Sequence, residues 1–177
     1  EATDRRVLSF FCPPQRPMDN VEWTLASPQE DEFALCTATF KSPCMAWIFP
    51  RRRKKFAPYL TFRGVPETEI AQWRSAFELF LKKLTWKYGR PLILKSPPHT
   101  GRIRLLLEMF PGARFVHIHR NPSAVFPSSR RTFQMMHDWH GLQRPDTDDF
   151  DGWVLQQYRE LYEAFFAEKD MIPDGCF

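Results

Sequence analysis

Glycine, cysteine and long apolar runs are scarce in this sequence, and each scarcity excludes a class of protein. The 177 residues include seven glycines and four cysteines, and the cysteines show neither CxxC pairing nor the spacing of a zinc site. This pattern argues against a disulfide framework and indicates a reducing compartment, so we expect a cytoplasmic protein. No apolar run is long enough to cross a bilayer. We therefore expect neither a membrane span nor a signal peptide.

The overall composition is that of a globular domain whose core is built from large apolar and aromatic side chains. The chain is 43% hydrophobic, 15% aromatic and 26% charged, so we predict one domain over residues 1–177. The net charge is +4, a mild excess that suits a small anionic ligand and is too weak for a nucleic-acid-binding surface. The chain begins at Glu1 rather than Met and ends in "MIPDGCF", so we expect a fragment, truncated at both ends.

Two stretches in the first half carry helix signals. Residues 27–40, "SPQEDEFALCTATF", offer Ser27 as N-cap and Glu30 as its capping-box partner. From Glu67 onward apolar residues recur at helical spacing until Gly89 ends the pattern. These signals predict a helix from Ser27 and a long amphipathic helix from Glu67. A Pro-rich loop over residues 11–20 precedes both.

A strand, a helix and a second strand can be recognised in the middle of the chain. "PLILK" (91–95) and "ARFVHIHR" (113–120) are apolar runs suited to strands, and "TGRIRLLLEMF" (100–110) between them has helical periodicity. Strands joined through a helix are parallel with a right-handed crossover, so the predicted fold class is α/β. A further helix begins with Asn121 as N-cap, and a last amphipathic helix runs through the region of Trp153 to Phe165, which we expect to cover one face of the sheet.

Both predicted strands end on a cation. Ligands of open parallel sheets bind beyond the carboxyl ends of the strands, where Lys95 and Arg120 would meet. Each cation also precedes the start of a helix, where backbone N–H groups favour an anion. Ser128 lies eight residues after Arg120, on the second turn of the next helix, within reach of the same anion. The pattern predicts a phosphate site.

The segment "LKSPPHTGRIRLLLEMFPGARFVHIHRNPSAVFPSS" resembles the central part of sulfotransferases, especially their bacterial and tyrosylprotein-type branch. The resemblance implies a P-loop-like parallel sheet flanked by helices and sulfuryl transfer from 3'-phosphoadenosine-5'-phosphosulfate to a hydroxyl acceptor, with no metal. It also implies that Arg120 and Ser128 bind the 3'-phosphate and that Lys95 contacts the phosphosulfate. The acceptor would be a small molecule, a carbohydrate or a peptide rather than nucleic acid, and the oligomeric state is left open.

One motif of that family is missing. Its Gly-containing phosphosulfate loop should precede residue 30, and neither RSGTT nor GxxxxGK occurs here. Truncation explains this, and the alternative is a non-catalytic module on the same fold that binds a phospho-ligand or an anionic polymer. A nucleotide kinase is disfavoured, because no Walker Lys-Ser/Thr and no obvious magnesium carboxylate is present.

The catalytic base has two candidates. His99 follows Lys95 by four residues and titrates near neutrality, although it or Thr100 could instead simply cap a helix. Glu30 is implied by the tyrosylprotein-type branch, which uses a Glu in this region, although the capping box fully accounts for it and is the preferred interpretation. His117 and His119 share one face of a strand without a further ligand, so we interpret them as structural rather than as a metal pair. The run "RRRKK" (51–55) is a solvated loop or a recruiter of an acidic acceptor.

Overall fold

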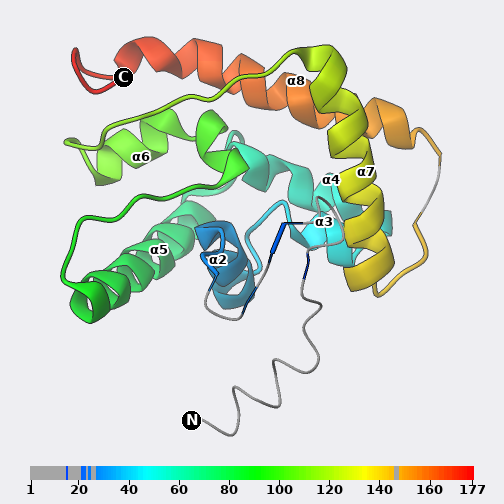
Figure 1. Cartoon of the computed structure of the whole chain (residues 1–177), viewed down its shortest axis with the longest axis horizontal. Coiled ribbons are helices and arrows are strands. Elements are labelled where there is room, and N and C mark those ends of the chain that lie inside the picture. Colours follow the sequence, from blue (N-terminus) through cyan, green and yellow to red (C-terminus); the bar gives the residue numbers. More distant parts are fainter. Residues whose placement is uncertain (1–14, 16–20, 23, 25–26, 146–147) are drawn as a thin grey trace, which may run out of the picture.

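A computed structural model describes residues 15, 21–22, 24, 27–145 and 148–177 (Figure 1). Most of the predicted loop at 11–20, including Cys12, lies outside these residues. The α-helices are α2 (Asp31–Thr39), α3 (Met45–Ile48), α4 (Arg53–Phe56), α5 (Glu67–Tyr88), α6 (Ile103–Met109), α7 (Pro122–His140) and α8 (Phe150–Glu168). Short 3-10 turns join them: η1 (Pro50–Arg52), η2 (Ala57–Leu60), η3 (Pro97–Gly101) and η4 (Lys169–Met171).

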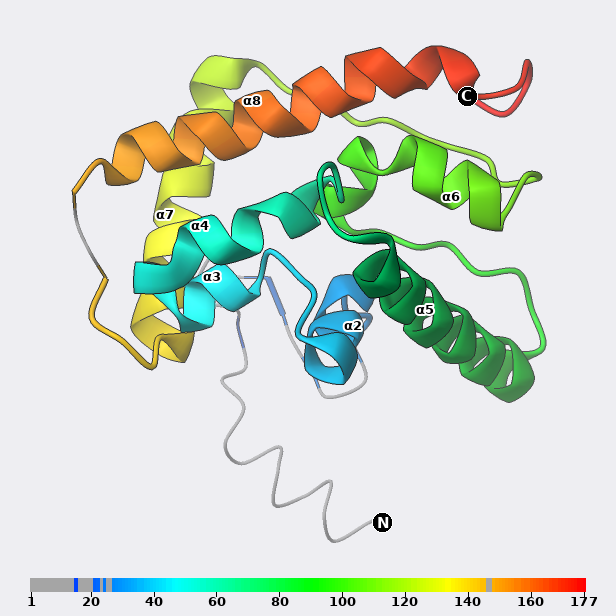
Figure 2. The same cartoon turned by 180° about the vertical axis from the view of Figure 1, so that it is seen from behind.

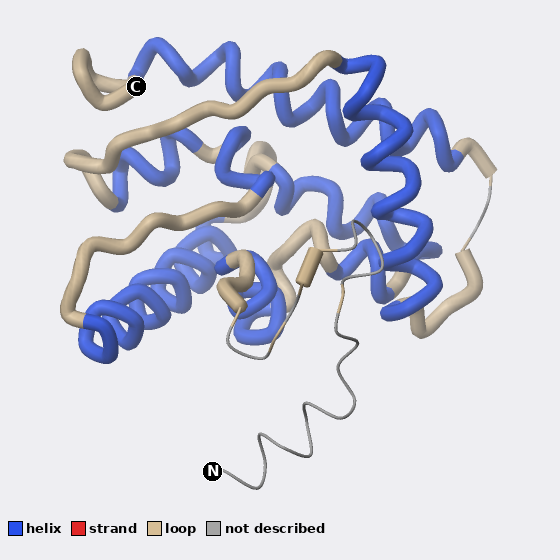
Figure 3. Tube along the Cα trace, viewed as in Figure 1, coloured by secondary structure: helices blue, strands red, loops and turns tan. Residues whose placement is uncertain are grey.

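The predicted α/β fold class with a P-loop-like parallel sheet is wrong for this structure. Over the described ranges, the only β pairing is an isolated antiparallel bridge between Gln15 and Glu22, and Figure 3 shows helices and loops alone. Residues 91–96 and 113–120 are extended, but no hydrogen-bonded ladder joins them within the described chain. A strand requires such a ladder to a neighbouring extended segment. The apolar runs therefore remain extended connections between helices.

These two connections keep the alternation of a strand. Leu92 and Leu94 are partly buried, whereas Ile93 between them is 98% exposed. In the second segment, Phe115 packs against the core and its N–H donates to the Cys176 carbonyl at 2.7 Å, whereas Val116 is exposed. The apolar runs thus predicted an extended backbone correctly, whereas the burial expected of every apolar residue in them and the pairing were wrong.

Most of the helix predictions are confirmed. α5 ends at Gly89, which adopts φ 57° and accepts the left-handed conformation that terminates the helix. α7 begins as predicted, with the Asn121 side chain accepting a hydrogen bond from the Ser123 N–H at 2.9 Å. α6 lies within its predicted range, and α8 includes the predicted region of Trp153 to Phe165 and extends three residues beyond it at each end. The start of α2 is different: the helix begins at Asp31, so Ser27 is not its N-cap and the capping box does not form.

The helices pack in layers around an aromatic core. Trp73 and Phe77 of α5 are fully buried and contact Phe62, while Leu35 of α2 and Leu105 and Leu106 of α6 complete the cluster. Figures 1 and 2 show α8 along one side of the molecule beside α6, with α5 and α2 on the other side of α6. α7 crosses the opposite end, where it packs on α3 and α8. Instead of covering a sheet, α8 packs chiefly on η3, which positions residues 97–101 near α2.

Candidate functional site

Three consecutive acidic residues at the start of α2 each contact one basic residue of the segment that leads from the first extended run into α6. Glu30 contacts Lys95, Asp31 contacts His99, and Glu32 contacts Arg102. The partners are Lys95 at the end of the extended run, His99 in η3 and Arg102 just before α6. The sequence predicted Glu30, Lys95 and His99 separately as catalytic candidates, and the structure brings all three to one place.

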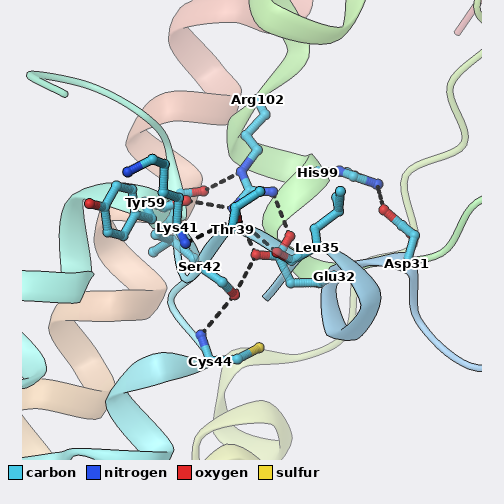
Figure 4. Close-up of polar contacts among 11 residues, drawn as sticks. Asp31, Glu32, Leu35, Thr39, Lys41, Ser42, Cys44, Tyr59, His99 and Arg102 are labelled. Carbon is cyan, nitrogen blue, oxygen red and sulfur yellow. Dashed lines mark hydrogen bonds and ion pairs between the residues drawn. The ribbon is translucent and has the colours of Figure 1, made fainter. Parts of the chain in front are cut away.

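The innermost pair, Glu32 with Arg102, is structural. Neither side chain has exposed surface, and the two guanidinium nitrogens Nη1 and Nη2 donate to the Glu32 carboxylate at 2.6 and 3.2 Å (Figure 4). Arg102 also donates to the carbonyls of Leu60 and Tyr59, at 3.2 and 2.5 Å, while Ser42 Oγ donates to Glu32 at 2.7 Å. Every charge in this pair is compensated, so it fixes α2 against α6 and leaves no group free for chemistry.

The middle pair is nearly as enclosed. His99 Nε2 lies 2.8 Å from Asp31 Oδ2, and the two side chains are 14% and 3% exposed. Because a neutral carboxylate-bound imidazole donates its N–H, this contact places the proton on Nε2. His99 Nδ1 is buried without a hydrogen-bond partner among the described residues, and the ring packs 5.8 Å from that of Phe77. Neither ring nitrogen is open to an approaching hydroxyl group in this arrangement.

The outermost pair is accessible. Lys95 Nζ donates to Glu30 Oε1, and the Lys95 side chain is 77% exposed while that of Glu30 is 22% exposed. Glu30 occupies the N-cap position of α2 but makes no side-chain capping bond. The structural explanation that the sequence offered for Glu30 is therefore absent, and among the described residues the partner of its carboxylate is Lys95. This is a carboxylate and an ammonium group side by side, able to accept a proton and to stabilise negative charge.

The two predicted phosphate ligands lie elsewhere. Arg120 is exposed at the end of the second extended segment, and Ser128 is exposed on the second turn of α7. No hydrogen bond or ion pair connects either of them to Glu30, Lys95 or His99 in the part of the chain that is described. Arg120 directly precedes Asn121, the N-cap of α7, and the first N–H groups of this helix are already bonded: Ser123 donates to Asn121 Oδ1, and Ala124 and Val125 donate to the Asn121 carbonyl.

Other reactive groups do not form a second centre. Burial raises the pKa of both the Cys36 and the Cys44 thiols, which keeps them protonated and unreactive. His117 and His119 stack with their ring centres 6.3 Å apart, and His117 packs 4.3 Å from Phe165, in line with a structural role. Across the described residues, no group of three His, Cys, Asp or Glu side chains is arranged to hold a metal ion.

Sequence reasoning missed Asp31 and Arg102. The signal was present in two spacings: "EDE" at 30–32, and basic residues at 95, 99 and 102. Three adjacent acids and three bases separated by about one helical turn are complementary only when the two segments lie side by side, and nothing local in the sequence predicts that contact.

None of the helices in the described residues is long and apolar enough to cross a membrane. Free thiols are found at Cys36, Cys44 and Cys176. The reducing compartment indicated by cysteine usage stays a prediction.

Comparison with known proteins identifies the family. A family model described as "Sulfotransferase family" matches residues 6–177. Two curated relatives are the omega-hydroxy-beta-dihydromenaquinone-9 sulfotransferases of Mycobacterium bovis and Mycobacterium tuberculosis, each 34% identical over 170 residues. The matched region covers 96% of this chain and 44% of each relative, so the chain spans less than half the length of the relatives it matches. No solved structure matches. On the strength of a match over nearly its whole length, the chain belongs to the sulfotransferase family.

Proposed function

We propose that the chain takes part in sulfuryl transfer from 3'-phosphoadenosine-5'-phosphosulfate to a hydroxyl acceptor, with release of adenosine 3',5'-bisphosphate. Membership of the sulfotransferase family gives the class of reaction. The observation that carries the assignment of roles is the Glu30–Lys95 pair, which is accessible and is not used for capping.

Glu30 is the proposed general base. Its carboxylate removes the proton of the acceptor hydroxyl while the acceptor oxygen forms a bond to sulfur. The bond between sulfur and the bridging phosphate oxygen breaks, and negative charge develops on that oxygen. Lys95 stabilises this charge, as its ammonium group is exposed and stands next to the base. Metal chemistry is not needed in this scheme, because the charges are handled by one carboxylate and one ammonium group.

Arg120 and Ser128 are proposed to bind the 3'-phosphate. The Arg120 guanidinium supplies charge-assisted donors and the Ser128 hydroxyl supplies a neutral one, and both side chains are exposed. The donor nucleotide would then bridge from this site to Lys95. The relatives are named for an omega-hydroxy dihydromenaquinone. We therefore propose a hydroxyl-bearing quinone-type acceptor for this chain as well.

A Glu30→Gln variant tests the assignment of the base. We expect at least about a hundredfold loss of turnover, the usual contribution of a general base, with unchanged affinity for adenosine 3',5'-bisphosphate. The assay follows labelled sulfate from the donor into an omega-hydroxy quinone. Asp151→Asn is the matched control, because Asp151 is also an exposed carboxylate bonded to one cation, Arg130. Full activity of Glu30→Gln would remove Glu30 from the mechanism, and no transfer by the unaltered protein would reject the function itself.

A further inference from the structure

The end of α5 and the residues that follow it form a surface of unusual composition, which we call the α5 tip (residues 79–93). It contains four basic residues and neither Asp nor Glu. It also carries four strongly exposed apolar or aromatic side chains: Leu79 at 54%, Trp86 at 90%, Tyr88 at 50% and Ile93 at 98% exposure. Large apolar side chains in water are unfavourable, and their grouping on one surface indicates a binding partner.

Four residues of the tip share one face of α5, whereas Tyr88 lies on the same side of the helix as Phe77. Leu79, Lys82, Lys83 and Trp86 follow the spacing i, i+3, i+4, i+7, which aligns them along the helix. The buried residues Trp73 and Phe77 lie on the opposite side, toward the core. Figures 1 and 2 both show the C-terminal end of α5 at the periphery of the molecule, away from α7 and α8. The tip is thus a protruding edge rather than a gap between helices.

Little negative charge opposes the cations of the tip. The α5 carboxylate beside it is Glu78, which pairs with Lys82 at 3.1 Å. Glu108 of the neighbouring helix α6 is bonded to Arg74 instead. Lys87 and Arg90 lie against the Tyr88 ring, 5.3 and 5.6 Å from its centre. Cations next to aromatic rings, with one carboxylate among them, suit a surface that is both anionic and apolar.

A shallow groove of about 470 Å³ lies at the C-terminal end of α5, on the side of Leu81 and Thr85 rather than on the face of Trp86. Most of its lining is apolar, with Leu81 from α5, Pro91 and Leu92 from the extended segment and Phe110 after α6, and Arg90 is the basic residue among its lining. An apolar groove next to a guanidinium matches the two parts of an anionic lipid, an acyl chain and a phosphate.

We propose that the α5 tip binds the surface of an anionic lipid bilayer. Trp86 and Ile93 enter the interface between headgroups and acyl chains, where amphipathic aromatic rings are preferred. Lys83, Lys87 and Arg90 contact lipid phosphates, each adding to the attraction of a negatively charged surface. The inference rests on the exposure, charge and geometry of the tip and does not depend on the catalytic roles proposed above.

Flotation of the protein with lipid vesicles tests this proposal. We expect binding to vesicles of phosphatidylcholine and phosphatidylglycerol in equal parts, and little binding to phosphatidylcholine alone. The triple variant Lys83→Gln, Lys87→Gln, Arg90→Gln should bind anionic vesicles at least about tenfold more weakly, because three headgroup contacts are lost. Trp86→Ser should reduce binding by about tenfold while leaving the charge unchanged.

A matched control separates the tip from net charge. Arg51→Gln, Arg52→Gln, Lys54→Gln removes three exposed cations from the other basic run of the protein and should retain binding within about threefold. Circular dichroism checks that each variant is folded. An equal loss in the control, or equal binding to neutral vesicles, would overturn the proposal. So would self-association that disappears in Trp86→Ser without lipid present, since the occupant would then be a second copy of the chain.

Discussion

Arg102 and Glu32 form an ion pair in which neither side chain retains any exposed surface. The guanidinium also lies over two aromatic rings, 4.8 Å from that of Phe62 and 5.1 Å from that of Trp73. The pair thereby joins α2, the start of α6 and the core of α5. It also sets the register for the two pairs beside it, so that Asp31 meets His99 and Glu30 meets Lys95.

Replacing Arg102 by Met should strongly destabilise the protein. The substitution keeps much of the side-chain volume but leaves the Glu32 carboxylate buried without its cation, and we expect a loss of about 3–5 kcal/mol in the free energy of unfolding. Urea denaturation followed by circular dichroism measures the change. The control Arg159→Met breaks an exposed pair with Glu163, and because water and salt screen such a pair it should change the free energy of unfolding far less. Similar values for the two variants would show that burial of the Arg102 pair is unimportant.

The contact between His99 and Asp31 leads to a prediction that distinguishes a structural role of His99 from a role as the catalytic base. Glutamine can place a side-chain N–H donor where His99 Nε2 lies, without a group that titrates near neutrality. If His99 only holds η3 against α2, His99→Gln should retain turnover within about threefold, whereas His99→Leu should lose at least about 1 kcal/mol of stability through the orphaned Asp31 carboxylate. Turnover and urea denaturation are measured for both variants.

The opposite outcome would assign the catalytic role to His99. A His99→Gln variant that is as stable as the unaltered protein but inactive would make His99 the base, in place of Glu30. The pH dependence of turnover provides a second reading, since a supporting residue can be replaced by an amide without altering the pH profile.

Sequence patterns predicted what is local in this fold. The cap at Asn121, the stop at Gly89 and the amphipathic repeats of α5 and α8 depend on neighbouring residues, and all are present. The capping box at Ser27 and Glu30 did not form although its pattern was complete: α2 begins at Asp31, and the Glu30 side chain contacts Lys95 rather than capping the helix. An exposed ion pair is worth no more than a cap, so this contact alone does not explain the later start of the helix.

The prediction of β-strands at the two extended segments was wrong for a different reason. Alternating apolar residues at 91–95 and 113–120 predict an extended backbone, but a sheet depends on a neighbouring segment that supplies the ladder. The candidate site shows the same contrast between what can be predicted from the sequence and what depends on contacts between distant segments. Lys95 and His99 were identified from residue type and position and Glu30 from the family resemblance, whereas Asp31 and Arg102 became visible only when α2 and residues 95–102 were seen to lie together.

His137 should make the stability of the protein fall in mild acid. It is buried beside Phe150 and Trp153, and burial lowers its pKa in the folded state, with the nearby Arg53 acting in the same direction and Asp138 opposing. The unfolded chain then binds a proton near pH 6.5 that the folded chain binds only at lower pH. The free energy of unfolding should therefore decrease below about pH 6.5, by up to about 1.4 kcal/mol per pH unit, until the folded pKa is passed.

Urea denaturation between pH 7.5 and pH 5 checks this dependence. His137→Phe should flatten it in part, because the pKa of His117 is also lowered by burial and contributes with the same sign. His140→Gln, at an exposed position three residues further along α7, serves as the control and should leave the slope unchanged. A slope that is identical in His137→Phe would show that His137 is not its source.

Arg120 provides the most direct test of the nucleotide site. Arg120→Ala should weaken binding of adenosine 3',5'-bisphosphate by about 2 kcal/mol, roughly thirtyfold, through loss of a charge-assisted bond to phosphate. Isothermal titration calorimetry measures the affinity, and AMP, which lacks the 3'-phosphate, should bind weakly and equally to both proteins.

Arg131→Ala removes another exposed cation, from the middle of α7, and controls for net charge. Because Arg120 is exposed, the variant should unfold at the same urea concentration as the unaltered protein, so a loss of affinity would belong to the phosphate contact itself. An unchanged dissociation constant for the bisphosphate would exclude Arg120 from the site and leave the start of α7 without its proposed ligand.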